Sequence, residues 1–143
     1  MVEALAQQGV RVLLPVLQPD WDLDWAEYAG SDSLRGGPAG MVEGTGDLLG
    51  REAVAAADAV LVPALLVDRQ GARLGRGAGC YDRVLRRVNP LSTLVAAVVY
   101  DDERLASLPL EPHDVRVRAV LTPHSGLELL VVGTNEPAES AER

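Results

Sequence analysis

Three glycines alternate between positions 75 and 79, and they separate an apolar run from an amphipathic segment. The apolar run, 59–63, has the length and composition of a buried strand. The segment after the glycines carries apolar side chains at helical spacing, and Asn89-Pro90 ends it because proline disfavours the α conformation of the residue before it. These apolar residues are Tyr81, Val84, Leu85 and Val88. The sequence therefore predicts a strand, a glycine-rich loop and a helix, in that order.

This order of elements is typical of a site for a phosphate group. Glycine lets the backbone approach a ligand closely, and the free N–H groups of a helix N-terminus favour negative charge. Six of the thirteen arginines lie in 69–87, although the net charge is −8. We predict that Arg73 and Arg76 contact phosphate oxygens, because guanidinium groups bind them bidentately. A P-loop is excluded because the chain has no lysine, and a dinucleotide fingerprint would need glycine at the position of Cys80.

The rest of the chain alternates apolar runs with helical segments. Strands are predicted at 11–17, 94–100, 117–122 and 127–132, and helices at 2–8, 51–57 and 102–106. The interval 18–50 is expected to be a loop with one short strand over 23–28. The pattern predicts an α/β fold, a three-layer α/β/α sandwich around a mostly parallel sheet. We expect one domain over 1–134 and a disordered tail over 135–143.

Composition restricts the class of protein. The 143 residues suffice for a hydrophobic core, and the charge of −8 disfavours nucleic acid or an anionic membrane as a partner. The single cysteine excludes an intramolecular disulfide and indicates a reducing compartment. No apolar stretch approaches the roughly 20 residues that span a bilayer. We expect a cytoplasmic protein with small-molecule substrates, either a monomer or a weak homo-oligomer.

Several polar and aromatic residues allow two interpretations from the residues alone. Asp82 lies in the first helical turn, where a carboxylate complements the helix dipole or binds an ion. Cys80 is either a reactive thiolate or a small tolerated residue. Trp25 and Tyr28 either stack on a ligand ring or pack the loop. The two histidines, His113 and His124, are too few and too scattered for a zinc site.

Two segments carry a resemblance to a known family. Residues 62–83 read Val-Pro-Ala-Leu-Leu-Val-Asp-Arg-Gln-Gly-Ala-Arg-Leu-Gly-Arg-Gly-Ala-Gly-Cys-Tyr-Asp-Arg. They resemble the pattern V-P-G-x-x-F-D-x-x-G-x-R-L-G-x-G-x-G-Y-Y-D of the 5-formyltetrahydrofolate cyclo-ligase family, also called methenyltetrahydrofolate synthetase. Pro112-His113-Asp114 resembles the later P-x-E-x-H-D of that family. The resemblance covers 4–130.

The resemblance implies a reaction and a set of site residues. Members use ATP and Mg²⁺ to convert 5-formyltetrahydrofolate into 5,10-methenyltetrahydrofolate, with release of ADP and phosphate. By resemblance, Asp82 and Asp114 bind Mg²⁺, and Arg76 and Tyr81 are the catalytic candidates. The nucleotide-binding candidates form one continuous loop: Arg73, Leu74, Gly75, Arg76, Gly77, Ala78, Gly79, Cys80 and Tyr81.

The sequence also departs from the family pattern. Members of the family usually carry an N-terminal Lys-x-x-x-Arg segment that contacts ATP. This chain contains no lysine, so we expect it to lack that contact. Cys80 replaces one of two tyrosines, and Arg118 stands where the family commonly has aspartate. The alternative hypothesis is an N-terminally truncated or degenerate relative that binds nucleotide or folate without turnover. A weaker alternative, a relative of sugar-phosphate isomerases, would need a general base that the sequence does not identify.

Overall fold

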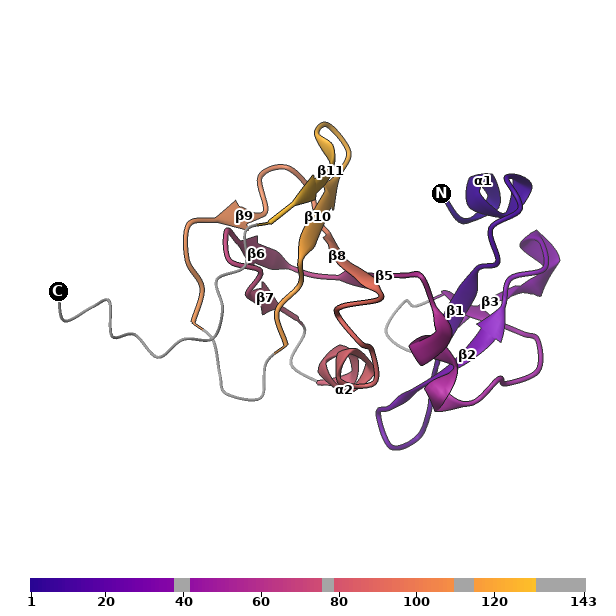
Figure 1. Ribbon diagram of the computed structural model, residues 1–143. Helices are drawn as coiled ribbons and strands as arrows, with labels where there is room; N and C mark the ends of the chain where they lie inside the picture. Colours follow the sequence, from indigo (N-terminus) through magenta and orange to yellow (C-terminus); the bar gives the residue numbers. More distant parts are fainter. Residues whose placement is uncertain (38–41, 76–78, 110–114, 131–143) are drawn as a thin grey trace, which may run out of the picture. The chain divides into compact units, whose positions relative to one another are not determined.

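The computed structural model describes residues 1–37, 42–75, 79–109 and 115–130, and it divides the chain into two units (Figure 1). Unit 1 comprises Met1–Ala57 and Ala78–Asn89. Unit 2 comprises Asp58–Gly77 and Pro90–Arg143. The predicted strand at 59–63 therefore belongs to unit 2, and the helix that follows the glycines belongs to unit 1.

Unit 1 begins with a short helix and a β-hairpin. Helix α1 (Val2–Gln7) precedes Gly9, whose φ of 83° permits the change of direction that was predicted there. Strand β1 (Leu13–Leu17) pairs antiparallel with β2 (Leu23–Glu27), so both predicted strands are confirmed. In the hairpin turn Trp21 adopts a φ of 64°, in the left-handed region that bulky residues rarely occupy.

The interval 18–50 contains more regular structure than predicted. Besides β2 it holds the 3₁₀ helix η1 (Ser31–Ser33) and an antiparallel pair, β3 (Leu34–Gly36) with β4 (Val42–Gly44). Glu43 of β4 is buried, and one of its carboxylate oxygens accepts the Leu17 N–H at 3.0 Å. The loop expectation was wrong for these residues, because strands of three residues are stabilised by such pairing and leave no periodic pattern in the sequence.

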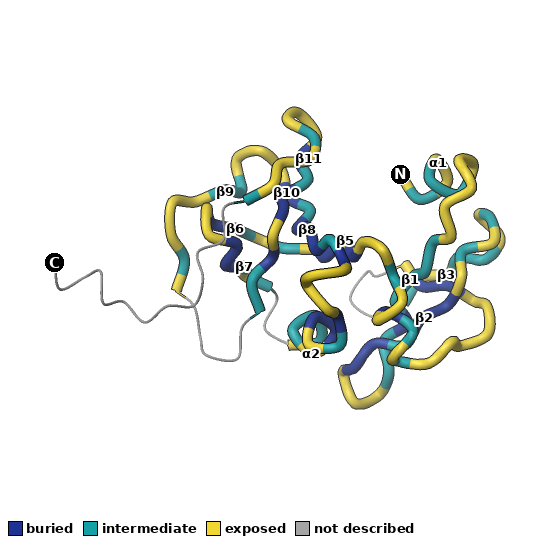
Figure 2. Tube along the Cα trace, viewed as in Figure 1, coloured by how far each residue is buried: buried dark blue, intermediate teal, exposed yellow. Residues whose placement is uncertain are grey.

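Helix α2 (Cys80–Arg86) confirms the helix predicted after the glycines. Its residues Val84 and Leu85, with Val88 beyond its end, are buried as the apolar spacing predicted, and Tyr81 is half-buried. The segment predicted as a helix at 51–57 is helical but forms the 3₁₀ helix η3 (Arg51–Ala56). Figure 2 shows buried residues on both α2 and β2. The core of unit 1 includes Val16, Leu23, Trp25, Ala26, Val54, Val84, Leu85 and Val88.

Unit 2 is built on a mixed four-stranded sheet with the order β11-β10-β8-β5. Strands β5 (Ala59–Pro63), β8 (Leu94–Val98) and β10 (Ala119–Thr122) are parallel neighbours, and β11 (Gly126–Leu129) pairs antiparallel with β10. All four lie within or close to predicted strands. Their buried small and β-branched residues form the core of this unit: Val60, Val62, Val95, Ala96, Ala97, Ala119 and Val120.

A second, three-stranded sheet of unit 2 was not predicted. Strand β6 (Leu66–Asp68) pairs antiparallel with β7 (Arg73–Leu74) and parallel with β9 (Arg104–Leu105). The helix predicted at 102–106 is wrong, because this segment joins β6 as an added strand. Tertiary pairing here overrides a weak helical preference.

The α/β class is thus confirmed, with a sheet that is parallel except for its antiparallel edge strand in unit 2. The three-layer arrangement and the domain limits 1–134 stay predictions. The tail over 135–143 lies outside the described residues. In the described residues no helix is long and apolar enough to cross a membrane.

Candidate functional site

The predicted nucleotide-binding loop is divided between the two units. Arg73, Leu74 and Gly75 belong to unit 2, whereas Gly79, Cys80 and Tyr81 belong to unit 1. Three members of the loop lie outside the described residues: Arg76, Gly77 and Ala78. Each part is therefore described within its own unit.

In unit 2, Arg73 is the last basic residue before the glycines and lies on β7. Its Nη1 donates to the Pro63 carbonyl at 3.3 Å. A Cβ at Gly75 would lie 2.9 Å from the same nitrogen, so the absence of a side chain there leaves space for the guanidinium group. The side chain of Leu74 is 47% exposed. This short strand thus places a half-buried arginine beside glycine backbone, an arrangement suited to an anion.

In unit 1, helix α2 starts at Cys80 immediately after Gly79, whose φ is 72°. Gly79 is the N-cap residue and, as a glycine, offers no side chain to cap this helix end. Cys80, Tyr81 and Asp82 are all half-buried in the first turn. The first turn therefore combines a thiol, a phenol and a carboxylate on a helix whose other face is anchored in the core.

The metal-binding prediction concerns two aspartates, Asp82 and Asp114. Asp82 lies on α2, and Asp114 lies outside the described residues. In the part of the chain that the structure describes, no group of three or more His, Cys, Asp or Glu side chains could hold a metal ion. The pairing of Asp82 with Asp114 stays a prediction.

Sequence reasoning missed a cluster of ion pairs that holds α2 in unit 1. The Asp22 carboxylate, which is buried, accepts hydrogen bonds from Nη1 and Nη2 of Arg87 at 2.8 and 2.5 Å. Arg51 of η3 donates to the same carboxylate at 3.2 Å and to Asp20 at 2.7 Å. Arg83, one turn before Arg87, donates to the Asp20 carbonyl at 3.3 Å. The turn of the β1–β2 hairpin is thereby joined to α2 and to η3.

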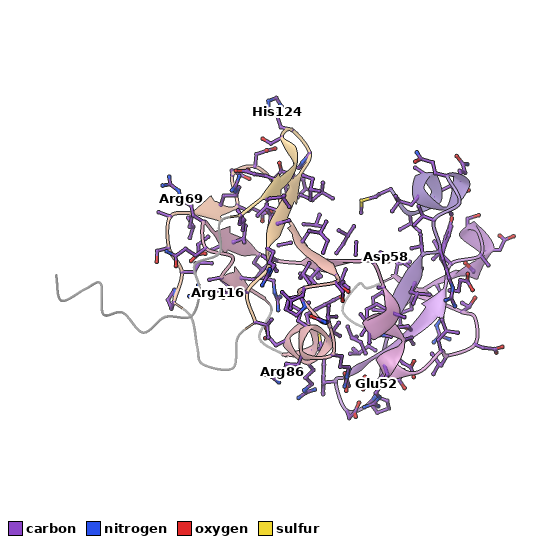
Figure 3. All side chains as sticks on the ribbon, viewed as in Figure 1. Glu52, Asp58, Arg69, Arg86, Arg116 and His124 are labelled. Carbon is purple, nitrogen blue, oxygen red and sulfur yellow. The ribbon has the colours of Figure 1, made fainter. Side chains whose placement is uncertain are left out.

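The electrostatics of this cluster follow from its geometry. The hydrogen bonds from Arg87 hold the pKa of Asp22 well below its usual value of 3.8, against the opposing effect of burial. In return, the bonds to Asp22 raise the pKa of Arg87. Glu52, which Figure 3 shows on η3, lies 3.5 Å from Nε of Arg87 and adds a second negative partner. The cluster fixes the C-terminal end of the helix whose first turn carries the site candidates.

The remaining candidates are placed as follows. Trp25 is only 6% exposed and belongs to the core of unit 1, which favours packing over stacking on a ligand. Its indole N–H is buried, without a hydrogen-bond acceptor among the described residues. The Tyr28 hydroxyl pairs with Glu3. His124 is exposed, and His113 lies outside the described residues.

Unit 2 also has an open cleft of about 550 Å³. Arg104, which lines it, pairs with Glu128 at 2.5 Å. The cleft is lined by Arg69, Arg104, Leu105, Ala106, Glu128, Leu129 and Leu130. None of these is a predicted site residue.

Comparison with known proteins identifies the family. The model of the 5-formyltetrahydrofolate cyclo-ligase family matches residues 1–123. A 5-formyltetrahydrofolate cyclo-ligase of Mycolicibacterium smegmatis is 44% identical over 135 residues, which cover 91% of this chain and 69% of that protein. A protein of the same name from Escherichia coli is 30% identical over 125 residues, 86% of this chain and 69% of that protein.

Solved structures show the same fold. The structure of Aquifex aeolicus 5,10-methenyltetrahydrofolate synthetase matches with a TM-score of 0.70 at 24% identity and covers 99% of this chain and 71% of that chain. The Mycoplasma pneumoniae 5,10-methenyltetrahydrofolate synthetase matches with a TM-score of 0.60 at 18% identity, over 82% of this chain and 59% of that chain.

Proposed function

The chain belongs to the 5-formyltetrahydrofolate cyclo-ligase family, and from that premise we propose that it converts 5-formyltetrahydrofolate into 5,10-methenyltetrahydrofolate at the expense of ATP. The observation that carries the proposal is the family match over 1–123, which includes the whole glycine-rich segment. The 44% identity to a curated cyclo-ligase supports the same reaction.

In the proposed reaction the formyl oxygen takes the γ-phosphoryl group of ATP, N10 attacks the activated carbon, and phosphate leaves as the ring closes. Protein groups form no covalent bond in this scheme, so positioning and charge neutralisation supply the catalysis. Arg73 and Arg76 would bind phosphate oxygens, and the glycine backbone would admit the nucleotide closely. Tyr81 would orient the substrates from the first turn of α2.

Magnesium is proposed as the metal ion that accompanies ATP. Mg²⁺ prefers one or two carboxylates and completes its coordination with phosphate oxygens and water. The half-buried Asp82, without a larger acidic cluster in the described residues, fits such a set with few protein ligands. Asp114 would supply the second carboxylate. When bound, the ion would neutralise charge on the phosphate oxygens.

Turnover tests the proposal directly. The purified chain is incubated with Mg-ATP and 5-formyltetrahydrofolate, and the absorbance of the methenyl product is followed. We expect product formation in the wild type and a loss of kcat/KM for ATP of about tenfold or more in Arg76→Ala, as for other donors to transferring groups.

Arg69→Ala is the matched control, because this exposed arginine lies in the same segment but outside the proposed contacts. It should leave kcat/KM unchanged. A folded wild-type chain that binds nucleotide or folate without forming product would instead favour the degenerate relative. Equal losses in both variants would show that general positive charge, and no specific contact at Arg76, assists the reaction.

A further inference from the structure

An exposed aromatic side chain lies where the parallel strands of unit 2 end. Tyr100 is 68% exposed. It follows β8 two residues beyond Val98, which pairs with Pro63 of β5 and with Leu121 of β10. Figure 1 shows these three strands in unit 2. Ligands of parallel α/β sheets bind beyond the carboxyl ends of the strands, so Tyr100 lies at the edge of the sheet where a ligand is expected.

The turn that carries Tyr100 is held by four hydrogen bonds. The Tyr100 N–H donates to the Glu103 carboxylate at 2.7 Å, and the Glu103 N–H donates to the Tyr100 carbonyl at 3.0 Å. The Glu103 carbonyl accepts the N–H of Val67 on β6 at 3.1 Å. The Asp101 carboxylate accepts the N–H of His124, which Figure 3 labels in the β10–β11 turn, at 3.3 Å. A ligand that contacts this residue therefore has little additional backbone to order.

The guanidinium group of Arg73 lies at the same edge of the sheet. Its Nη1 donates to the carbonyl of Pro63, the last residue of β5, at 3.3 Å. Neighbouring strands lie about 4.8 Å apart and rise about 3.3 Å per residue, which places the Cα of Tyr100 about 8 Å from that of Pro63. One nucleotide is long enough to contact both the guanidinium group and the aromatic ring.

Charge distinguishes the two ends of this edge. The guanidinium group of Arg73 suits phosphate oxygens. The turn at Tyr100 contains three carboxylates, which repel phosphate but accept hydrogen bonds from an amino group on a ring. They belong to Asp101, Asp102 and Glu103. The edge therefore matches a ligand that has a phosphate chain at one end and a neutral, amino-substituted ring at the other.

We propose that Tyr100 stacks on the adenine ring of ATP and contributes to the selection of the nucleotide, while Arg73 binds the phosphate chain. This inference rests on the proposed function, which makes ATP the phosphoryl donor and Arg73 a phosphate contact. Both residues belong to unit 2. Tyr100 contacts no reacting atom in this scheme, so its replacement should change the affinity for nucleotide.

Two phosphate compounds separate recognition of the ring from recognition of the phosphates. Calorimetric titration of the full chain gives the Kd of a non-hydrolysable ATP analogue and that of inorganic tripolyphosphate, each with Mg²⁺. Tyr100→Ala should raise the Kd of the analogue at least about fivefold, the lower range for stacking of a base on an aromatic side chain. It should leave the Kd of tripolyphosphate unchanged, whereas Arg73→Ala should raise both.

Two control variants test the origin of the effect. Tyr100→Phe keeps the ring and should bind the analogue as the wild type does, because stacking needs no hydroxyl group. Leu129→Ala is the matched exposed substitution in the same sheet. Leu129 is 71% exposed and pairs with Ala119, at the amino end of β10 and thus at the opposite edge. It should leave both dissociation constants unchanged.

The possible results distinguish this inference from the proposed function. Unchanged affinity of Tyr100→Ala for the analogue, an equal loss for both compounds, or an equal loss in Tyr100→Phe would overturn the inference. A loss confined to binding of 5-formyltetrahydrofolate would assign the ring to the other substrate and also reject adenine stacking. A wild-type chain that binds neither phosphate compound would reject the proposed function itself, whereas a wild type that binds the analogue independently of Tyr100 rejects only this inference.

Discussion

Replacement of Asp22 by asparagine tests the ion-pair cluster that joins α2 to the β1–β2 hairpin. In the wild type one carboxylate oxygen accepts the Leu23 N–H at 2.8 Å and Nη1 of Arg87 at 2.8 Å. The other oxygen accepts hydrogen bonds from Nη2 of Arg87 at 2.5 Å and from Nη1 of Arg51 at 3.2 Å. In the asparagine variant the amide oxygen can still accept from the Leu23 N–H and from Nη1 of Arg87. The amide NH₂ group is a donor, so it cannot accept from Nη2 of Arg87 or from Nη1 of Arg51.

The magnitude follows from the exposure of the two arginines. The Arg87 side chain is 19% exposed, so its lost bond to a charged group should cost about 1.5–3 kcal/mol. The Arg51 side chain is 38% exposed and keeps Asp20 as a partner, so the loss of its contact with Asp22 should lower the free energy of unfolding by about 0.2–1 kcal/mol. We expect a total loss of about 2–4 kcal/mol, which lowers the urea midpoint by about 1–2 M at a typical denaturant dependence.

Tryptophan fluorescence is the appropriate assay, because both tryptophans of the chain, Trp21 and Trp25, lie on this hairpin. The emission therefore reports unfolding of unit 1. Glu27→Gln is the matched control, since its pair with Arg11 is exposed on both sides, at 50% and 62%. It should change the free energy of unfolding by less than about 0.5 kcal/mol.

The pH dependence has a definite sign. Because Arg87 holds the folded-state pKa of Asp22 below the usual 3.8, the carboxylate stabilises the fold above that value. Its contribution is lost as the pH falls below about 4 toward the folded-state pKa. The difference in the free energy of unfolding between wild type and Asp22→Asn should therefore be constant from about pH 5 to 7 and shrink below pH 4. A difference that stays the same down to pH 2.5 would refute an origin in the carboxylate charge.

Three further substitutions have defined outcomes. Trp21→Gly should stabilise unit 1 by about 0.5–1 kcal/mol in urea unfolding followed by Trp25 fluorescence, because glycine relieves the left-handed conformation and Trp21 is 56% exposed; a loss of stability would mean that its ring packs productively. Asp82→Asn should weaken Mg²⁺-dependent ATP binding in calorimetry and keep the melting temperature within about 3 °C, since a first-turn carboxylate contributes little to stability. Unchanged binding would remove Asp82 from the metal site. Cys80→Tyr should preserve or improve folate binding, and a collapse of binding would assign the thiol a role of its own.

Much of the fold was predictable because it depends on local patterns. The apolar run at 59–63 is β5, and the helical spacing that begins at Tyr81 gave α2. The short strands β7 and β9 were missed because two residues contain no periodicity. Both strands form only because they pair with β6, which lies between β7 and β9.

The candidate site divides in the same way. The anion-binding character of the glycine-rich segment follows from residue types and their spacing, whereas the family and the metal-binding role of Asp82 were indicated by the resemblance of 62–83 to the family pattern. Only the tertiary structure brought Arg87 to Asp22, 65 positions apart, and the Leu108 N–H to Asp68, 40 positions apart. Arginine and aspartate are usually solvated surface residues, so their sequence carries no sign of such partners. A buried charge pairs with whichever distant segment the fold places beside it, and the packing of the whole unit decides which segment that is.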